Sequence, residues 1–364
     1  MLGARLKLAR KRAGLSLRDL KERLQGRVSA QAIGKYERGE MMPSSTILIA
    51  LSQTLALSIG YFMSPMQARL DGVEFRKKAG TTARDRARVE AEVLQQVERY
   101  LMIEEILQLD SASWNNPLPE HQRRLITDVE QSEVLAAQVR AAWKLGVDPI
   151  LNLTQLLEQH GIKVLILPLP ECVDGLTCLV HRPERDVVPC IVINRAGNLE
   201  RRRMTLAHEL GHRLIDPASS VNSEVAAKRF ASAFLIPAEH LRLEIGEHRH
   251  AFGYRELIQL KRLYQVSAAA MLVRCEQLGI ISHSGFIHTL QTVARGWRKS
   301  EPEPLELPGQ QGQLEAPERF ERLCYWALSE GMISLPKAAE LLQMPVDEIE
   351  TALKGSVKDN AGYH

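Results

Sequence analysis

The sequence lacks several features that would assign it to a membrane or secreted class. It has no apolar run near the ~20 residues that a membrane-spanning helix needs, and no apolar segment of a secretion signal follows its basic N-terminus. It has only five cysteines, an odd number, with no Cys-x-x-Cys pair, and no internal repeat of fixed period. We therefore expect a cytoplasmic protein with reduced cysteines that are buried as small apolar side chains.

The charge of the chain is unevenly distributed over an ordinary globular composition. The 364 residues suit about two or three domains, and 45% are apolar and 25% charged, as in soluble globular proteins. The first 62 residues hold 11 Lys/Arg and 4 Asp/Glu, so they carry +7, and the remainder of this +3 chain carries −4. A small basic head on a slightly acidic body indicates that the head binds a polyanion.

Hydrophobic periodicity predicts a multidomain, mostly α chain with one small sheet. Short apolar runs at 163–169, 176–180 and 188–194 predict strands, and a helix follows them, which gives an α+β core. The long helix expected over 82–109 either joins two subunits or packs within the chain. The expected regions are a five-helix head at 1–63, a linker and long helix at 64–128, the α+β core at 129–285, a Pro/Gln/Glu-rich linker at 286–318 and three helices at 319–364.

The segment TLAHELGHRL, residues 205–214, has the spacing of a metal site. His208 and His212 are four residues apart, so on a helix their imidazoles share one face and suit Zn²⁺. Glu209 is turned roughly 100° from His208, where its carboxylate can take a proton from a water that the ion acidifies. Gly211 is costly inside a helix, which indicates that another segment packs closely there.

A third ligand is needed, because a catalytic zinc usually has three protein ligands. Asp216 shares the face of His212 but is about 12 Å of helix rise from His208, too far for one ion. In residues 223–237, a core-facing apolar stripe also carries Glu224, and a buried carboxylate is costly unless it is paired or binds a metal. The ordinary alternative is that Glu224 lies in the first turn of a helix, where anions are favoured.

The stretch RRRMTLAHELGHRL…SEVAAKRFASAFLIP resembles the ImmA/IrrE family of metallopeptidases over roughly 145–285. It has the family's Arg-rich lead-in, its TLAHELGH helix and its E-x-x-A-x-x-F-A-x-x-x-L-x-P pattern, with Lys228 where the family often has Asn or Asp. The resemblance implies a zincin-like core that binds Zn²⁺, or Mn²⁺, through His208, His212 and Glu224, with Glu209 as the base. It does not choose an oxyanion-stabilising group among His240, His248, His250, Tyr254 and Tyr264.

The head resembles an Xre/Cro-type helix-turn-helix, through GLSLRDLKERL and VSAQAIGKYERGEMMPS. In that motif the second helix enters the major groove of DNA, and half-site recognition implies a homodimer. Gln31 and Lys35 lie on the outer face of this helix and are expected to read bases, while Arg27 and Ser29 contact phosphates. For Arg27 and Lys35 a solvated surface charge is the alternative. By the same resemblance, Glu37 faces inward and pairs with Arg10.

These features together predict a bacterial transcriptional regulator that binds a double-stranded DNA operator and carries a zinc metalloendopeptidase. Its substrate would be a protein, such as a repressor or the product of a neighbouring gene. The alternatives are a transcription factor, or the antitoxin of a two-gene module, whose peptidase-like domain senses a ligand or binds a partner without turnover. The three terminal helices resemble the helical tail that follows this peptidase in similarly arranged regulators, and their acidic face favours a protein contact over DNA.

Overall fold

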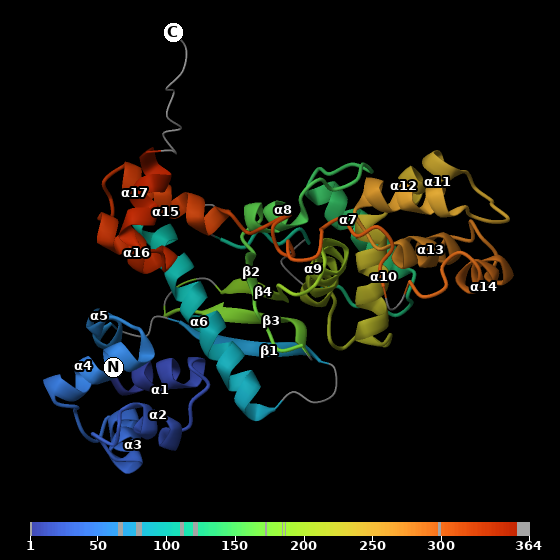
Figure 1. Cartoon of the computed structure of the whole chain (residues 1–364). Coiled ribbons are helices and arrows are strands. Elements are labelled where there is room, and N and C mark those ends of the chain that lie inside the picture. The colour runs from blue at the N-terminus through green and yellow to red at the C-terminus, as the bar shows by residue number, and fades with distance from the viewer. Residues whose placement is uncertain are drawn as a thin grey trace, which may run out of the picture.

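The computed structural model describes residues 2–64, 68–77, 82–109, 113–118, 123–171, 173–183, 185, 187–297 and 300–354. Over these residues the chain forms seventeen helices and one four-stranded sheet. Figure 1 shows a helical head, a long diagonal helix, a central sheet, a larger helical part beyond the sheet, and a helical tail. The expected multidomain, mostly α fold class is confirmed. No helix in the described part of the chain has both the length and the apolar character needed to cross a membrane.

The head contains the five expected helices. They are α1 (Leu2–Arg12), α2 (Leu17–Arg23), α3 (Ala30–Arg38), α4 (Ser45–Leu55) and α5 (Ile59–Met63). Serine side chains cap the last four of them, at Ser16, Ser29, Ser44 and Ser58. Gly39 ends α3 with a φ of 75°, a left-handed conformation that glycine adopts without strain. Arg10 Nε and Nη2 donate to the Glu37 carboxylate over 2.6 and 2.7 Å, so the expected pair is present and half-buried.

Helix α6 (Ala83–Ile106) connects the head, the sheet and the tail. A capping box between Thr82 and Asp85 starts it. Towards the head, Glu98 pairs with Arg5 of α1, and Arg84 bonds Asp19 of α2 over 2.8 Å. Its C-terminal half packs against the tail helices, which are α15 (Arg319–Ser329), α16 (Leu335–Leu342) and α17 (Val346–Lys354). Of the two roles left open by the sequence, packing within the chain is the one seen here.

The sheet has the strand order β1-β3-β4-β2. Its strands are β1 (Arg69–Lys77), β2 (Lys163–Leu167), β3 (Val173–His181) and β4 (Val188–Asn194). The three expected strands are confirmed, but β1 lies where the sequence indicated only a linker. It pairs antiparallel with β3, and its register shifts between Asp71 and Glu74. That bulge interrupts the two-residue alternation by which a strand is recognised in a sequence.

Two helical layers cover the sheet, and neighbouring residues of β4 point into different layers. Ile191 and Ile193 pack in the larger core with Leu206 and Leu210 of α9 (Leu199–Leu214). Cys190 and Val192 pack in a second core with the valines of α6, which approach the opposite face. The other helices of this domain are α7 (Gln131–Ala142), α8 (Leu153–Gln159), α10 (Ser223–Leu235), α11 (Ala238–Ile245), α12 (Tyr254–Tyr264), α13 (Ala268–Gln277) and α14 (His283–Gln291). Helix α9 is therefore positioned by its packing against one face of the sheet.

The acidic segment 300–318, predicted as part of a linker, packs against the α+β domain. Glu306 is buried and receives two hydrogen bonds from the buried Arg202, at 2.5 and 2.9 Å. Glu315 pairs with Arg203, the next arginine of α9. The arginine-rich start of α9 is therefore an internal anchor for this segment, since buried charges need such partners.

A buried charge cluster joins α6, α8, β2 and α15. Glu104 bonds Lys163 over 2.6 Å and Arg319 over 2.7 Å. Nearby, the Tyr100 hydroxyl donates to Glu158 over 3.0 Å. Burial raises the pKa of Glu158 to about 7, because the charged carboxylate loses its hydration. Since Arg319 of α15 lies among the charges that act on Glu158, we expect the contact between the tail and the α+β domain to depend on pH.

We expect Glu158→Gln to raise the free energy of unfolding above that of the wild type, and to do so more at pH 8 than at pH 5. In the wild type, folding raises the pKa of Glu158 from its ordinary 4.5 to about 7. The free energy of unfolding therefore falls as pH rises through that interval, by on the order of 3 kcal/mol for this group. Glutamine keeps the acceptor for Tyr100 without the charge. Thermal unfolding at both pH values measures the effect, with the exposed Glu105→Gln as control, and an equal shift at both pH values would contradict it.

Candidate metal centre and nucleic-acid interface

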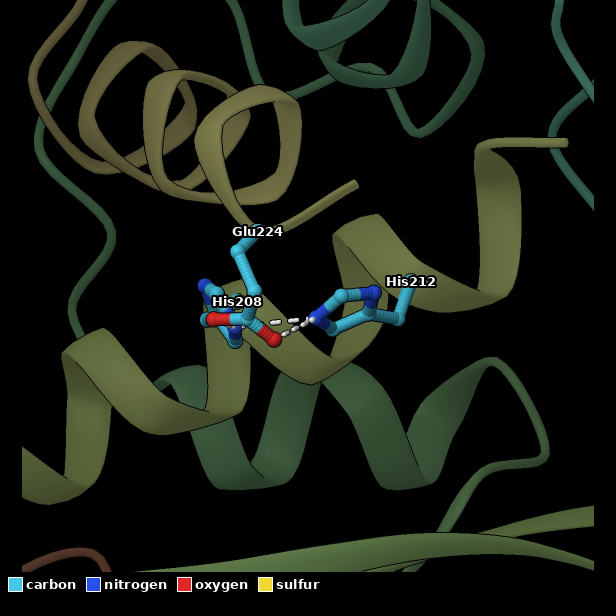
Figure 2. A group of neighbouring side chains, drawn as sticks. All are labelled: His208, His212 and Glu224. Atoms are coloured by element: carbon cyan, nitrogen blue, oxygen red, sulfur yellow. Dashed lines mark hydrogen bonds and ion pairs between the residues drawn. The ribbon is translucent and has the colours of Figure 1, made fainter. Parts of the chain in front are cut away.

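His208 and His212 lie on one face of α9. Glu224 lies on the neighbouring helix α10 and faces both of them. Asn198 starts α9 by accepting from the Arg201 backbone N–H. The two histidine Nε2 atoms are 2.9 Å apart. The Glu224 Oε1 lies 3.2 Å from His212 Nε2, and its Oε2 lies 3.4 Å from His208 Nε2 (Figure 2). The structure thus brings together the three residues that the sequence proposed as ligands.

Close packing of the two helices brings Glu224 to the histidines. A Cβ at Gly211 would lie 3.0 Å from Phe230 Cδ1 and 3.2 Å from Ala227 Cα. The absence of a side chain at Gly211 therefore allows α10 to approach α9, as its unfavourable place in a helix suggested. Asn222 caps α10 by accepting from the backbone N–H groups of Glu224 and the next residue. Glu224 consequently lies in the first helical turn and also faces the imidazoles. A favoured anion at the start of a helix and a metal ligand are therefore compatible roles for this residue.

The spacing of these side chains suits a divalent cation. Three ligand atoms about 2.0–2.1 Å from one tetrahedral ion would be about 3.3 Å apart, and the observed separations are 2.9, 3.2 and 3.4 Å. His208 is 1% exposed, whereas 53% of the Glu224 side chain is exposed, so the cluster has a buried side and an open side. Two imidazoles and one carboxylate are also a donor set of hydrolytic zinc sites. The residues present therefore fit the ion that the sequence implied.

A cleft of about 510 Å³ opens beside the cluster. His212 and Glu224 are among its lining residues. Its other lining residues include Glu74 of β1, Arg86 of α6 and Arg123. The sequence does not indicate these residues, because they come from segments expected to be linker or helix surface and no spacing relates them to His208.

Glu209 and the other polar candidates have different surroundings. Glu209 follows His208 in α9 and is 3% exposed. Among the described residues, the lining of the cleft includes none of the five histidines and tyrosines considered for oxyanion stabilisation. His240 Nδ1 lies 2.7 Å from the Tyr264 hydroxyl, and Tyr254 donates to Glu303 over 3.1 Å. Asp216 lines the cleft, and its Oδ1 accepts from the Ala218 backbone N–H. It is not part of the three-residue cluster.

The four residues expected at DNA lie on the outer surface of the head. Arg27, Ser29, Gln31 and Lys35 are all exposed. Ser29 is the cap of α3 and accepts from the Ala32 backbone N–H over 3.1 Å, which leaves its hydroxyl proton available to a phosphate. Neither Arg27 nor Lys35 forms an ion pair with another described residue. This face therefore presents to solvent one amide and two cations that form no ion pair within 4.0 Å among the described residues.

Comparison with known proteins found two family models along the chain. Residues 6–62 match a model described as helix-turn-helix. Residues 157–276 match the peptidase M78 model, described as IrrE N-terminal-like domain. No curated protein and no solved structure matched the chain. The first match covers the head, and the second includes α9, α10 and all three residues of the cluster.

Proposed function

Because the chain joins an Xre-type helix-turn-helix domain to an IrrE/ImmA-like domain, we propose that this DNA-binding regulator hydrolyses a peptide bond in a protein. The observation that carries the proposal is the group of His208, His212 and Glu224 at the edge of an open cleft. A purely structural helix pair would have no need for two imidazoles and a carboxylate within ion-binding distance of one another. The segment that supplies this site matches the model of a peptidase family, which supports the proposal.

In this proposal each residue of the site has a separate role. His208, His212 and Glu224 hold Zn²⁺, with Mn²⁺ as the second option. A divalent cation there supplies Lewis acidity toward the peptide carbonyl and makes water a better nucleophile at neutral pH. Glu209 acts as the general base that accepts the proton of the attacking water and returns it to the leaving amine. Arg123, which has no ion pair among the described residues, is available to a polar group of a chain in the cleft.

The substrate we propose is a folded protein or an exposed loop of one, such as a repressor or the product of a neighbouring gene. The cleft is lined by both signs of charge, including Glu74, Glu90, Arg86 and Arg123, as a polar peptide segment requires. We further propose a cytoplasmic homodimer, because a helix-turn-helix reads symmetric half-sites in pairs. The DNA operator and the protein substrate would then be bound by different domains of one chain.

The test is incubation of the zinc-loaded full chain with a library of native proteins, followed by mass spectrometry of new termini. We expect cleavage products from the zinc-loaded protein and none from protein whose metal has been removed with a chelator. Identical products from the metal-loaded and metal-stripped protein, or no products from either, would contradict the proposal. The absence of products would favour the alternative, a transcription factor or antitoxin whose peptidase-like domain senses a ligand or binds a partner without turnover.

For the head, we expect Gln31→Ala to weaken binding to a DNA site selected from a random pool by about 5- to 150-fold, as for loss of a bidentate base contact. Arg27→Ala should weaken binding to all sequences and reduce the salt dependence by about one counterion. Fluorescence anisotropy at several salt concentrations measures both. The matched control is Arg38→Ala, because Arg38 is already paired with Glu40 over 2.5 and 3.0 Å. Loss of affinity in Arg38→Ala equal to that in Arg27→Ala would contradict this assignment.

A further inference from the structure

A second cavity, larger than the cleft beside the metal centre, lies where the head, α6 and the tail meet. Its volume is about 730 Å³, within the range of sites for small organic ligands. The head contributes residues of α1, of α5 and of the turn that precedes α5. Helix α6 contributes residues between Gln95 and Met102, and the tail contributes residues of α16. An occupant would therefore touch three units of the chain at once.

Much of the wall of this cavity is apolar. Its apolar and aromatic lining residues are Ala56, Leu57, Tyr61, Met102, Ala339 and Leu341. The hydroxyl of Tyr61 is buried, and the guanidinium of Arg5 lies over its ring, 5.1 Å from the ring centre. A ligand for this wall needs an apolar body and at least one polar group.

The charged residues of the wall are paired, with one exception. Arg5 pairs with Glu98, and Lys337 with Glu340 over 3.1 Å. Arg12 donates to Gln95 over 2.6 Å and lies 4.0 Å from the carboxylate of Glu92. The remaining cation is Arg99, which forms no ion pair with any described residue.

Arg99 is a guanidinium with most of its hydrogen-bonding capacity unused. Its Nη1 donates to the Leu341 carbonyl over 2.6 Å, and its buried Nε has no partner in the described part of the chain. Its guanidinium carbon lies 5.9 Å from the centre of the Phe320 ring. Burial lowers the pKa of Arg99 to about 10, so it keeps its charge at neutral pH. Glu92 and Glu340 favour the charged form of Arg99, but each forms its ion pair with another cation, Arg12 and Lys337. A buried guanidinium with unused donors therefore favours a further anion at this position.

We propose that this cavity binds an amphipathic organic monoanion, with an apolar body against the wall of the cavity and a carboxylate on Arg99. A carboxylate matches the planar fork of a guanidinium and offers two acceptors to it. The ligand contacts the DNA-binding head, α6 and the tail together, so its binding free energy stabilises their observed arrangement. This inference does not depend on the metal centre or on peptidase activity.

The test uses the full chain and two matched probes, decanoate and decan-1-ol, which differ in the anionic group. Each is titrated against protein that carries the fluorescent monoanion 8-anilinonaphthalene-1-sulfonate. We expect decanoate to displace the dye at a concentration about 10-fold or more below that of decan-1-ol, as for a hydrogen-bonded charge. We also expect decanoate to raise the thermal unfolding midpoint. Equal displacement by the two probes, or no saturable dye binding, would overturn the proposal.

The variant Arg99→Gln should weaken decanoate binding by about 10- to 100-fold and leave decan-1-ol binding unchanged. The matched control is Lys337→Gln, which removes a cation of the same cavity that already has a carboxylate partner. Circular dichroism checks that both variants are folded. Should Arg99→Gln lose its fold, the comparison of the two probes on the wild type decides the question alone. Decanoate binding that is the same in Arg99→Gln and wild type would contradict the role of Arg99.

Discussion

Glu224→Ala is expected to remove most of the bound metal ion. In the wild type the carboxylate lies 3.2 and 3.4 Å from the two imidazole Nε2 atoms. Without it, His208 and His212 are the two ligands left in the three-residue cluster, fewer than the three protein ligands that such a centre uses. The loss of affinity should therefore exceed the 10- to 100-fold typical of removing an outer hydrogen-bond partner of a ligand. Elemental analysis after dialysis against a zinc buffer measures it.

The matched control for that experiment is Glu239→Ala. Glu239 is also near the start of a helix, α11, and is exposed and outside the cluster. It should keep the metal content of the wild type, and His212→Ala should lose metal as Glu224→Ala does. If Glu224→Ala keeps its metal content while His212→Ala does not, the third ligand is another residue. The exposure of the Glu224 side chain makes a folding defect in the alanine variant small.

The metal cluster was predictable from the sequence because its information is local. The four-residue spacing of His208 and His212 sets their common face on any helix. Glu224 was found from its place on an apolar stripe, and Gly211 indicated the close approach of that helix. In the head, serine caps and the Gly39 terminus are similarly local signals, so the five helices were predicted.

The walls of both cavities were not predictable, because they depend on contacts between distant segments. Strand β1 has a register shift that breaks its alternation, and only its pairing with β3 shows that it is a strand. The segment 300–318 has the composition of a linker, yet Glu306 is held by Arg202, more than a hundred residues earlier. Arg99 gave no signal either, since an arginine on a long helix is ordinarily solvated.

Glu209→Gln is expected to abolish measurable peptide hydrolysis and to keep the metal. Glutamine has nearly the volume of glutamate, so the 3%-exposed position should stay filled, while the group that accepts a proton is lost. Removing a general base lowers the rate by about 10²- to 10⁴-fold. The measurement is the rate of appearance of new termini, with elemental analysis of the same samples to show that His208, His212 and Glu224 still hold the ion.

DNA binding by the head is a measurement that distinguishes loss of catalysis from loss of fold in Glu209→Gln. The head has its own core, distinct from the core that contains α9, so Glu209→Gln should bind DNA as the wild type does. Glu239→Gln is the control for a change of charge on the same domain and should cleave normally. Unchanged products and rates in Glu209→Gln, with metal present, would show that Glu209 is not the base. Absence of cleavage in every variant and in the wild type would instead favour a regulator that uses the same cluster to bind without turnover.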